Sequence, residues 1–213
     1  PQDFEQATYW YGNAAVQGNA EAQYALAYNY QFGKGVTKDN KQALNWYRKS
    51  ANQGNDYAEN SIGNMYFMGY GIEKNYKLAE NWFRKAANKG NIQGQRNLAK
   101  VYEIGGKGII KDYTEALIWY TKAANQGDSE AQNNLGKMYE DAKGVSQDYD
   151  IALSWYNKSK IQNNEQAKRN FDLLEFRITS KENFDRQKFH TISSKKKIDL
   201  SLIHISEPTR RTP

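Results

Sequence analysis

Residues of the types that do chemistry are scarce in this 213-residue sequence, which contains no Cys and only two His, His190 and His204. Without Cys the chain has no thiolate nucleophile, no disulfide and no cysteine-ligated zinc site. The two His lack the short spacing of a metal-binding pair. His190 lies in a polar tail where general-base catalysis is not expected, and His204 lies in residues 200–213, which we interpret as an artefact. We therefore predict that the protein is not an enzyme and has no catalytic, cofactor-binding or metal-binding residue.

One catalytic spacing does occur, in the segment Ser193-Ser194-Lys195-Lys196. Ser-x-x-Lys is the arrangement of the serine nucleophile and its lysine in penicillin-binding proteins and class A β-lactamases. Here it lies within a short run of Ser and Lys, where a chance match is expected. We interpret the run as part of a solvated tail.

Glycine pairs and positive charge could suggest nucleotide or nucleic-acid binding. Pairs such as Gly33 and Gly35 do not form a dinucleotide fingerprint, because no predicted strand precedes them and no third Gly follows. The net charge of +6 is concentrated near the C-terminal end, since residues 180–213 carry eight basic and four acidic side chains. The preceding chain is nearly balanced, so its charge does not favour a nucleic-acid partner.

The strongest pattern in the sequence is an internal repeat. The secondary-structure elements of this repeat determine where all the other residues lie. The five Trp residues are spaced by 36, 36, 37 and 36 residues, and each is followed by another aromatic residue. A period between about 20 and 50 residues marks an array in which each repeat is one supersecondary unit. We predict a structural role, packing in the core, for Trp10, Trp46, Trp82, Trp119 and Trp155.

Each complete repeat has the pattern of two helices. In the first repeat, Asn19 is placed to cap a helix with an apolar stripe at Ala22, Leu26 and Tyr30. After a glycine turn, Asp39 is placed to cap a second helix, whose wide apolar face contains the Trp. The sequence therefore predicts an all-α solenoid of antiparallel helix pairs.

Recurring Gly and Asn or Asp residues divide the chain into units. Residues 1–18 are predicted to be the second helix of a truncated repeat, with an exposed apolar N-terminal edge and the native N-terminus missing. The array is followed by a capping helix at 164–178 and a basic, mostly disordered tail at 179–199. Residues 200–213 resemble the conceptual translation of a sequencing adapter, and we interpret them as an artefact. The four complete repeats are 19–54, 55–90, 91–127 and 128–163.

These motifs together resemble the Sel-one-like repeat (SLR) family, a relative of the tetratricopeptide repeat. The resemblance rests on the 36-residue period, on the pattern Asp-x-x-x-Ala-x-x-Trp-Tyr, and on blocks such as Lys85-Ala86-Ala87-Asn88-Lys89-Gly90, over about residues 3–171. It implies a right-handed, tetratricopeptide-like superhelix that serves as a scaffold or adaptor in protein assemblies. Some secreted members have been described as penicillin-binding or weak β-lactamases, but those are cysteine-rich and this chain is not.

Partner binding is expected where the repeats differ. Each first helix carries a variable stripe with spacing i, i+3, i+7 and i+10, about 180° from the core stripe, and first helices of stacked pairs line the concave surface. We predict that this inner stripe faces solvent and binds a protein or peptide, with Tyr24, Tyr28, Tyr57 and Phe67 as exposed aromatics. Its four positions hold, in repeat order, first Glu21, Tyr57, Gln93 and Glu130; second Tyr24, Asn60, Arg96 and Asn133; third Tyr28, Asn64, Lys100 and Lys137; and fourth Gln31, Phe67, Glu103 and Glu140.

The leading hypothesis is a protein–protein interaction scaffold that binds a peptide or a partner domain in the concave groove of the solenoid. Two alternatives stay open: a β-lactamase-like hydrolase, disfavoured by the missing Cys, and a nucleic-acid-binding helical repeat. We expect the protein to be a monomer. We also expect no association with membranes, because the mean hydropathy is −0.96. The absence of Cys favours a cytosolic setting.

Overall fold

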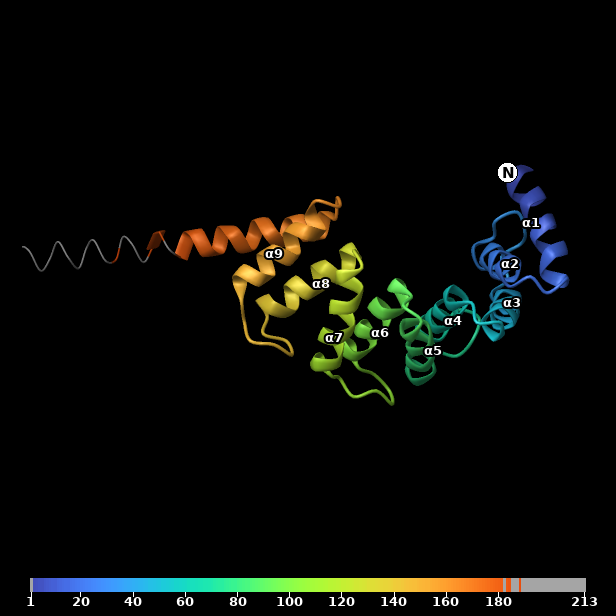
Figure 1. Ribbon diagram of the computed structural model, residues 1–213, viewed down its shortest axis with the longest axis horizontal. Helices are drawn as coiled ribbons and strands as arrows, with labels where there is room; N and C mark the ends of the chain where they lie inside the picture. The colour runs from blue at the N-terminus through green and yellow to red at the C-terminus, as the bar shows by residue number, and fades with distance from the viewer. Residues whose placement is uncertain (1, 182, 185–187, 189–213) are drawn as a thin grey trace, which may run out of the picture.

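The computed structural model describes residues 2–181, 183, 184 and 188, in which helices lie side by side. Figure 1 shows them following one another in chain order along a curved array, with the even-numbered helices nearer the inside of the curve than their odd-numbered partners. The described part contains no strand, and the prediction of an all-α solenoid of antiparallel helix pairs is confirmed. The helices are α1 (Gln2–Val16), α2 (Ala20–Phe32), α3 (Asn40–Asn52), α4 (Asp56–Met68), α5 (Tyr76–Asn88), α6 (Ile92–Ile104), α7 (Tyr113–Asn125), α8 (Ser129–Glu140) and α9 (Tyr149–Lys160).

Local sequence explains where these helices begin and end. The side chain of Asn19 accepts a hydrogen bond from the backbone N–H of Ala22, and that of Asp39 accepts from Lys41 and Gln42, so both predicted N-caps are confirmed. Such caps satisfy backbone donors that have no partner inside the helix. Helix α2 ends at Gly33, whose φ of 69° lies in the left-handed region that glycine adopts without a steric penalty.

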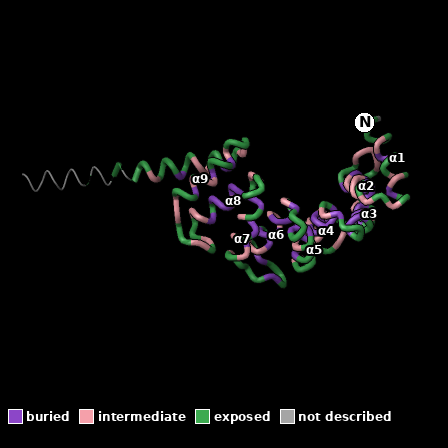
Figure 2. The backbone as a smooth tube through the Cα atoms, in the orientation of Figure 1, coloured by how far each residue is buried: buried purple, intermediate pink, exposed green. Residues whose placement is uncertain are grey.

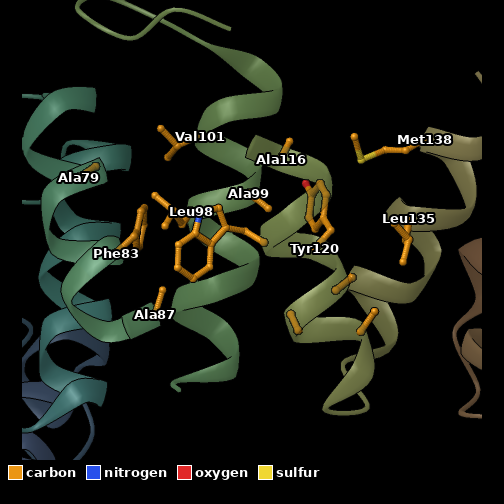
Figure 3. Close-up of a cluster of buried hydrophobic side chains, with 14 of the residues drawn as sticks. Ala79, Phe83, Ala87, Leu98, Ala99, Val101, Ala116, Tyr120, Leu135 and Met138 are labelled. Atoms are coloured by element: carbon orange, nitrogen blue, oxygen red, sulfur yellow. The ribbon is translucent and has the colours of Figure 1, made fainter. Parts of the chain in front are cut away.

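The core consists of thin layers between successive helices, visible as the purple segments along the array in Figure 2. Figure 3 shows one layer, in which Phe83 of α5 and Tyr120 of α7 flank Leu98 and Ala99 of α6. All four side chains are 0% or 1% exposed. Small residues such as Ala99 let the large aromatic rings approach the neighbouring backbone, as native packing density requires.

The Trp residues lie closer to the surface than predicted. Trp119 is 7% exposed, but Trp10 is 62% exposed, and the other three are intermediate. The aromatic residue that follows each of the four later Trp is the one that is fully buried: Tyr47, Phe83, Tyr120 and Tyr156. A Lys three residues after each later Trp covers its ring, with the ammonium 3.9–4.3 Å from the ring centroid. The indoles therefore seal the edge of each layer beneath a cation–π contact.

After α9 a further helix covers residues 165–181. The side chain of Asn164 accepts a hydrogen bond from the backbone of Ala167, and Leu174 is buried against Ala152 and Tyr156. The helix continues past residue 178, where the sequence predicted its end. Phe171, Leu174 and Ile178 form one apolar stripe that packs on α9. Most of the predicted tail, and all of residues 200–213, lie outside the described residues. Among the helices that the structure describes, none combines the length and the apolar character needed to cross a bilayer.

Candidate partner-binding surface

The four positions of the inner stripe differ in exposure: no residue at the second or fourth position is exposed, and those that are not buried are intermediate. Every residue at the first position is exposed, as are Lys100 and Lys137 at the third position. By contrast, Gln31, Asn60 and Asn133 are only 9%, 3% and 7% exposed. The prediction that the whole stripe faces solvent is therefore wrong for the second and fourth positions, and the reason differs between them.

Residues at the fourth position point toward the buried aromatic of the outer helix. The hydroxyl of Tyr47 donates to Oε1 of Gln31 at 2.8 Å, and that of Tyr120 donates to Oε2 of Glu103 at 2.8 Å. Tyr156 donates to Oε2 of Glu140 at 2.6 Å. Burial and the neighbouring carboxylate of Glu103 raise the pKa of Tyr120 above its ordinary value, so this hydroxyl stays protonated. The fourth position thus holds each helix pair together.

Residues at the second position join one repeat to the next. Asn97 donates to Oδ1 of Asn60 at 2.9 Å, and Asn170 donates to Oδ1 of Asn133 at 2.8 Å. A helical wheel describes one helix in isolation, whereas in the array the next inner helix covers this face. In both contacts the two asparagines are 37 residues apart in the sequence, and this recurring spacing is the signal that could have revealed them.

The second position in the other two repeats is also engaged. Arg96 forms a salt bridge with Asp128 at 2.7 Å and approaches Glu130 at 3.3 Å. The ring of Tyr24 lies 5.7 Å from that of Tyr47 and 6.0 Å from that of Tyr57, so it is half-buried rather than an exposed aromatic. These side chains have bonding partners within the solenoid and are not free to contact a ligand.

Three exposed apolar residues on the same face were missed by the sequence reasoning. Phe32, Met68 and Ile104 are 54%, 50% and 48% exposed. Each follows the third stripe position by four residues, so it lies one helical turn further along the same face, and the rings of Tyr28 and Phe32 lie 4.5 Å apart. Their own 36-residue spacing, directly before a loop Gly, could have identified them.

We use the term inner surface for the side chains on this face that remain accessible. Along α2 and α4 it is mainly apolar, with the acidic Glu21 at the start of α2, and along α6 and α8 it carries Lys100 and Lys137. A recess of about 480 Å³ opens where α4 and α6 begin, lined by Tyr57, Gln93 and the acidic side chains Asp56 and Asp128. The inner surface comprises Glu21, Tyr28, Phe32, Tyr57, Asn64, Met68, Gln93, Lys100, Ile104, Glu130 and Lys137.

This arrangement offers apolar contacts, amide hydrogen bonds and isolated charges, which are the means of binding a polypeptide. In the part of the chain that the structure describes, no group of three His, Asp or Glu side chains could hold a metal ion.

Comparison with known proteins places the repeats in a family context. The family model described as Sel1 repeat matches residues 1–19, 20–55, 56–91, 92–128 and 129–164. Among curated proteins, none matches the sequence.

Solved structures resemble both the sequence and the fold. A Sel1 repeat protein from Oxalobacter formigenes is 38% identical with a TM-score of 0.73, and the match covers 78% of this chain and 66% of that one. The antigen c5321, present in uropathogenic Escherichia coli strains and displaying an SLR fold, is 36% identical with a TM-score of 0.72, covering 80% of this chain and 36% of that one. Immunity protein Pa5087 from Pseudomonas aeruginosa is 29% identical with a TM-score of 0.52, covering 75% of this chain and 59% of that one. The chain therefore spans less than two thirds of each of these structures.

Proposed function

This chain belongs to the Sel1 repeat family, whose repeats generally form protein-interaction scaffolds, and we propose that it binds a partner protein through its inner surface. The observation that carries this proposal is a row of large exposed apolar side chains at one repeated position of the inner helices, Phe32, Met68 and Ile104. Tyr57, Phe32 and Met68 are each at least half exposed on α2 and α4. Contiguous exposed apolar side chains with a polar rim are typical of protein-binding surfaces.

The distribution of charge along the inner surface suggests the kind of segment that binds. The aromatic and apolar part on α2 and α4 suits large apolar side chains, and the part on α6 and α8 presents Lys100 and Lys137, while Glu130 is paired with Arg96. We expect a partner segment with apolar anchors at one end and acidic residues at the other. Contact with Lys100 and Lys137 would then steer its orientation.

Selection of peptides followed by titration tests the proposal. Peptides are selected from a displayed random library on the immobilised protein, and the affinity of a selected peptide is measured by calorimetry for the wild type, Tyr57→Ala and Met68→Ala. The matched control is Leu78→Ala, because Leu78 is 38% exposed on the outer helix α5. We expect each inner-surface variant to weaken binding by about tenfold or more, since truncating an anchor costs about 1–2 kcal/mol.

The opposite pattern would contradict the proposal. If the selected peptides lose affinity on Leu78→Ala and keep it on Tyr57→Ala and Met68→Ala, they bind another face. Thermal unfolding of each variant checks that any loss of binding does not come from loss of structure. Tyr24→Ala is not used, because Tyr24 packs against Tyr47 inside the solenoid.

A further inference from the structure

A second recess, separate from the inner surface, lies between α1, α2, the loop after α2, and α3. Its volume is about 470 Å³, and its apolar walls include Leu26, Tyr30 and Trp46. Gly12 of α1 also lines it. A Cβ atom at Gly12 would meet no other atom within 4 Å, so the space above this residue is open.

The next two repeats fill the corresponding space with an arginine. Arg48 and Arg84 follow Gly12 by one and two periods of 36 residues. Nη2 of Arg48 donates to the hydroxyl of Tyr66 at 3.0 Å, and Arg84 donates to the hydroxyl of Tyr102. The guanidinium carbon of Arg84 lies 5.7 Å from the centroid of the Tyr102 ring.

Tyr30 stands one period before Tyr66, so it is the equivalent hydroxyl at the open recess. Of the five equivalent positions two residues after each Trp, two hold an arginine that contacts a tyrosine, and the others hold Gly12, Thr121 and Asn157. At Gly12 there is no side chain at all, and the recess beside Tyr30 is left open.

Backbone geometry does not explain the glycine. Gly12 lies in the interior of α1 and is absent from the glycines with positive φ, so another residue would meet no conformational barrier. Glycine is unfavourable inside a helix because the unfolded chain gains more conformational freedom from it. The effect of Gly12 on the folded protein is to leave the recess open.

The recess is preorganised and electrostatically suited to a cation. The hydroxyl of Thr8 donates to the backbone carbonyl of Lys34 at 3.0 Å, and Nδ2 of Asn29 donates to that hydroxyl at 2.7 Å, which fixes α1 against α2 and its loop. Glu5 lines the recess and supplies a carboxylate. An aromatic hydroxyl and a carboxylate together form a favourable environment for a planar guanidinium, while the ring of Trp46 already lies beneath the ammonium of Lys49.

We propose that the recess at Gly12 receives the arginine side chain of a partner protein, with Tyr30 as hydrogen-bond acceptor, Leu26 as apolar wall and Glu5 as counter-charge. A lysine fits less well, because its compact ammonium lacks the flat surface and the fork of donors. The partner's arginine thus takes the place that Arg48 and Arg84 occupy in the following repeats.

The first experiment builds the missing side chain into α1. Gly12→Arg is compared with Gly12→Gln, which removes the same glycine but adds no charge, each with and without Tyr30→Phe. We expect Gly12→Arg to melt about 2–4 °C above Gly12→Gln, the shift that roughly one charge-assisted hydrogen bond gives in a protein of this size. Tyr30→Phe should remove most of that difference. Equal melting temperatures for the Arg and Gln variants would overturn the assignment of a guanidinium site.

The second experiment measures binding to the wild-type protein by NMR, using the indole N–H signal of Trp46, assigned with Trp46→Phe. The probes are N-acetyl-arginine amide, N-acetyl-citrulline amide and N-acetyl-norleucine amide. We expect a saturable shift with the arginine probe, about tenfold weaker binding of the citrulline probe, and loss of the shift in Gly12→Arg.

Equal binding of the citrulline or norleucine probe would show an apolar recess without preference for arginine and would overturn the proposal, as would no saturable shift with the arginine probe. Tyr57→Ala should leave the arginine response unchanged, because Tyr57 does not line this recess. Failure of the inner-surface proposal is therefore distinguishable from failure of this one.

Discussion

A matched pair of side chains joins the two helices of each complete repeat. Where the outer helix buries a tyrosine, as in Tyr47 and Tyr120, the inner helix supplies Gln31 or Glu103 as acceptor. The second repeat buries Phe83 instead, and its inner helix has Phe67, with the two rings 6.3 Å apart. The pairs change together because a buried hydroxyl without an acceptor is costly.

Phe83→Tyr tests this matching. We expect the single variant to lower the free energy of unfolding by about 1–3 kcal/mol, because the new hydroxyl would face the Phe67 ring rather than an acceptor. Phe83→Tyr combined with Phe67→Gln should recover much of the loss, since it recreates the pair formed by Tyr47 and Gln31. Urea unfolding of the two single variants and the double variant measures the coupling. Additive effects would show that the pair is not matched.

Glu80 is a second residue with a specific electrostatic role. It is 4% exposed and accepts hydrogen bonds from Lys77, Arg84 and Tyr102. Burial alone would raise the pKa of Glu80, but these three bonds together lower it below its ordinary value of 4.5. Burial and the Glu80 carboxylate also raise the pKa of Tyr102 to about 12.

The lowered pKa gives a prediction about acid stability. A carboxyl group with a lower pKa in the folded state stabilises the protein above its unfolded pKa, and this contribution is lost as the pH falls through the folded value. We expect Glu80→Gln to melt below the wild type at pH 7, with the difference shrinking as the pH falls below about 4.5. Thermal unfolding between neutral and acid pH measures it. A difference that does not change with pH would show that the ionised carboxylate contributes nothing.

At the scale of the helices, small residues set how closely the elements pack. Ala116 of α7 is 0% exposed and lies in the same core layer as Leu98 and Val101 of α6. We expect Ala116→Leu to destabilise the protein by roughly 1–3 kcal/mol, because three added carbons have no space. Ile118→Leu is the matched control, since Ile118 is 43% exposed on the same helix. Equal melting temperatures for Ala116→Leu and the wild type would contradict this packing.

The helices could be predicted from the sequence because their signals are local. Asn19 and Asp39 cap helices through their own side chains, and Gly33 ends one through its backbone. The inner stripe was predicted less well because exposure depends on the neighbouring repeat. Asn60 is polar and lies opposite the apolar stripe of its helix, yet Asn97 from the next inner helix covers it. The packing of the neighbouring repeat decides which polar residues are paired and which, like Lys100, stay accessible.

At the scale of the whole molecule, the array is held by junctions between neighbouring repeats. Nδ2 of Asn55 donates to Oε1 of Glu21 and that of Asn91 to Oδ2 of Asp56, each from one repeat to the repeat before it. Between the third and fourth repeats the contact is a salt bridge, with Arg96 Nη1 2.7 Å from Oδ2 of Asp128. Stability in such a solenoid is a sum over neighbouring units, so the inner surface can vary from repeat to repeat without loss of the fold.

The central claim is that a partner binds the inner surface, and site-specific photo-crosslinking tests it most directly. A p-benzoylphenylalanine is placed at Met68 on the inner helix α4 or at Ile118 on the outer helix α7, which are 50% and 43% exposed. Each protein is irradiated with a peptide selected on the wild type. We predict a cross-linked product from the Met68 position and none from the Ile118 position. Cross-linking from Ile118 but not from Met68 would contradict the account.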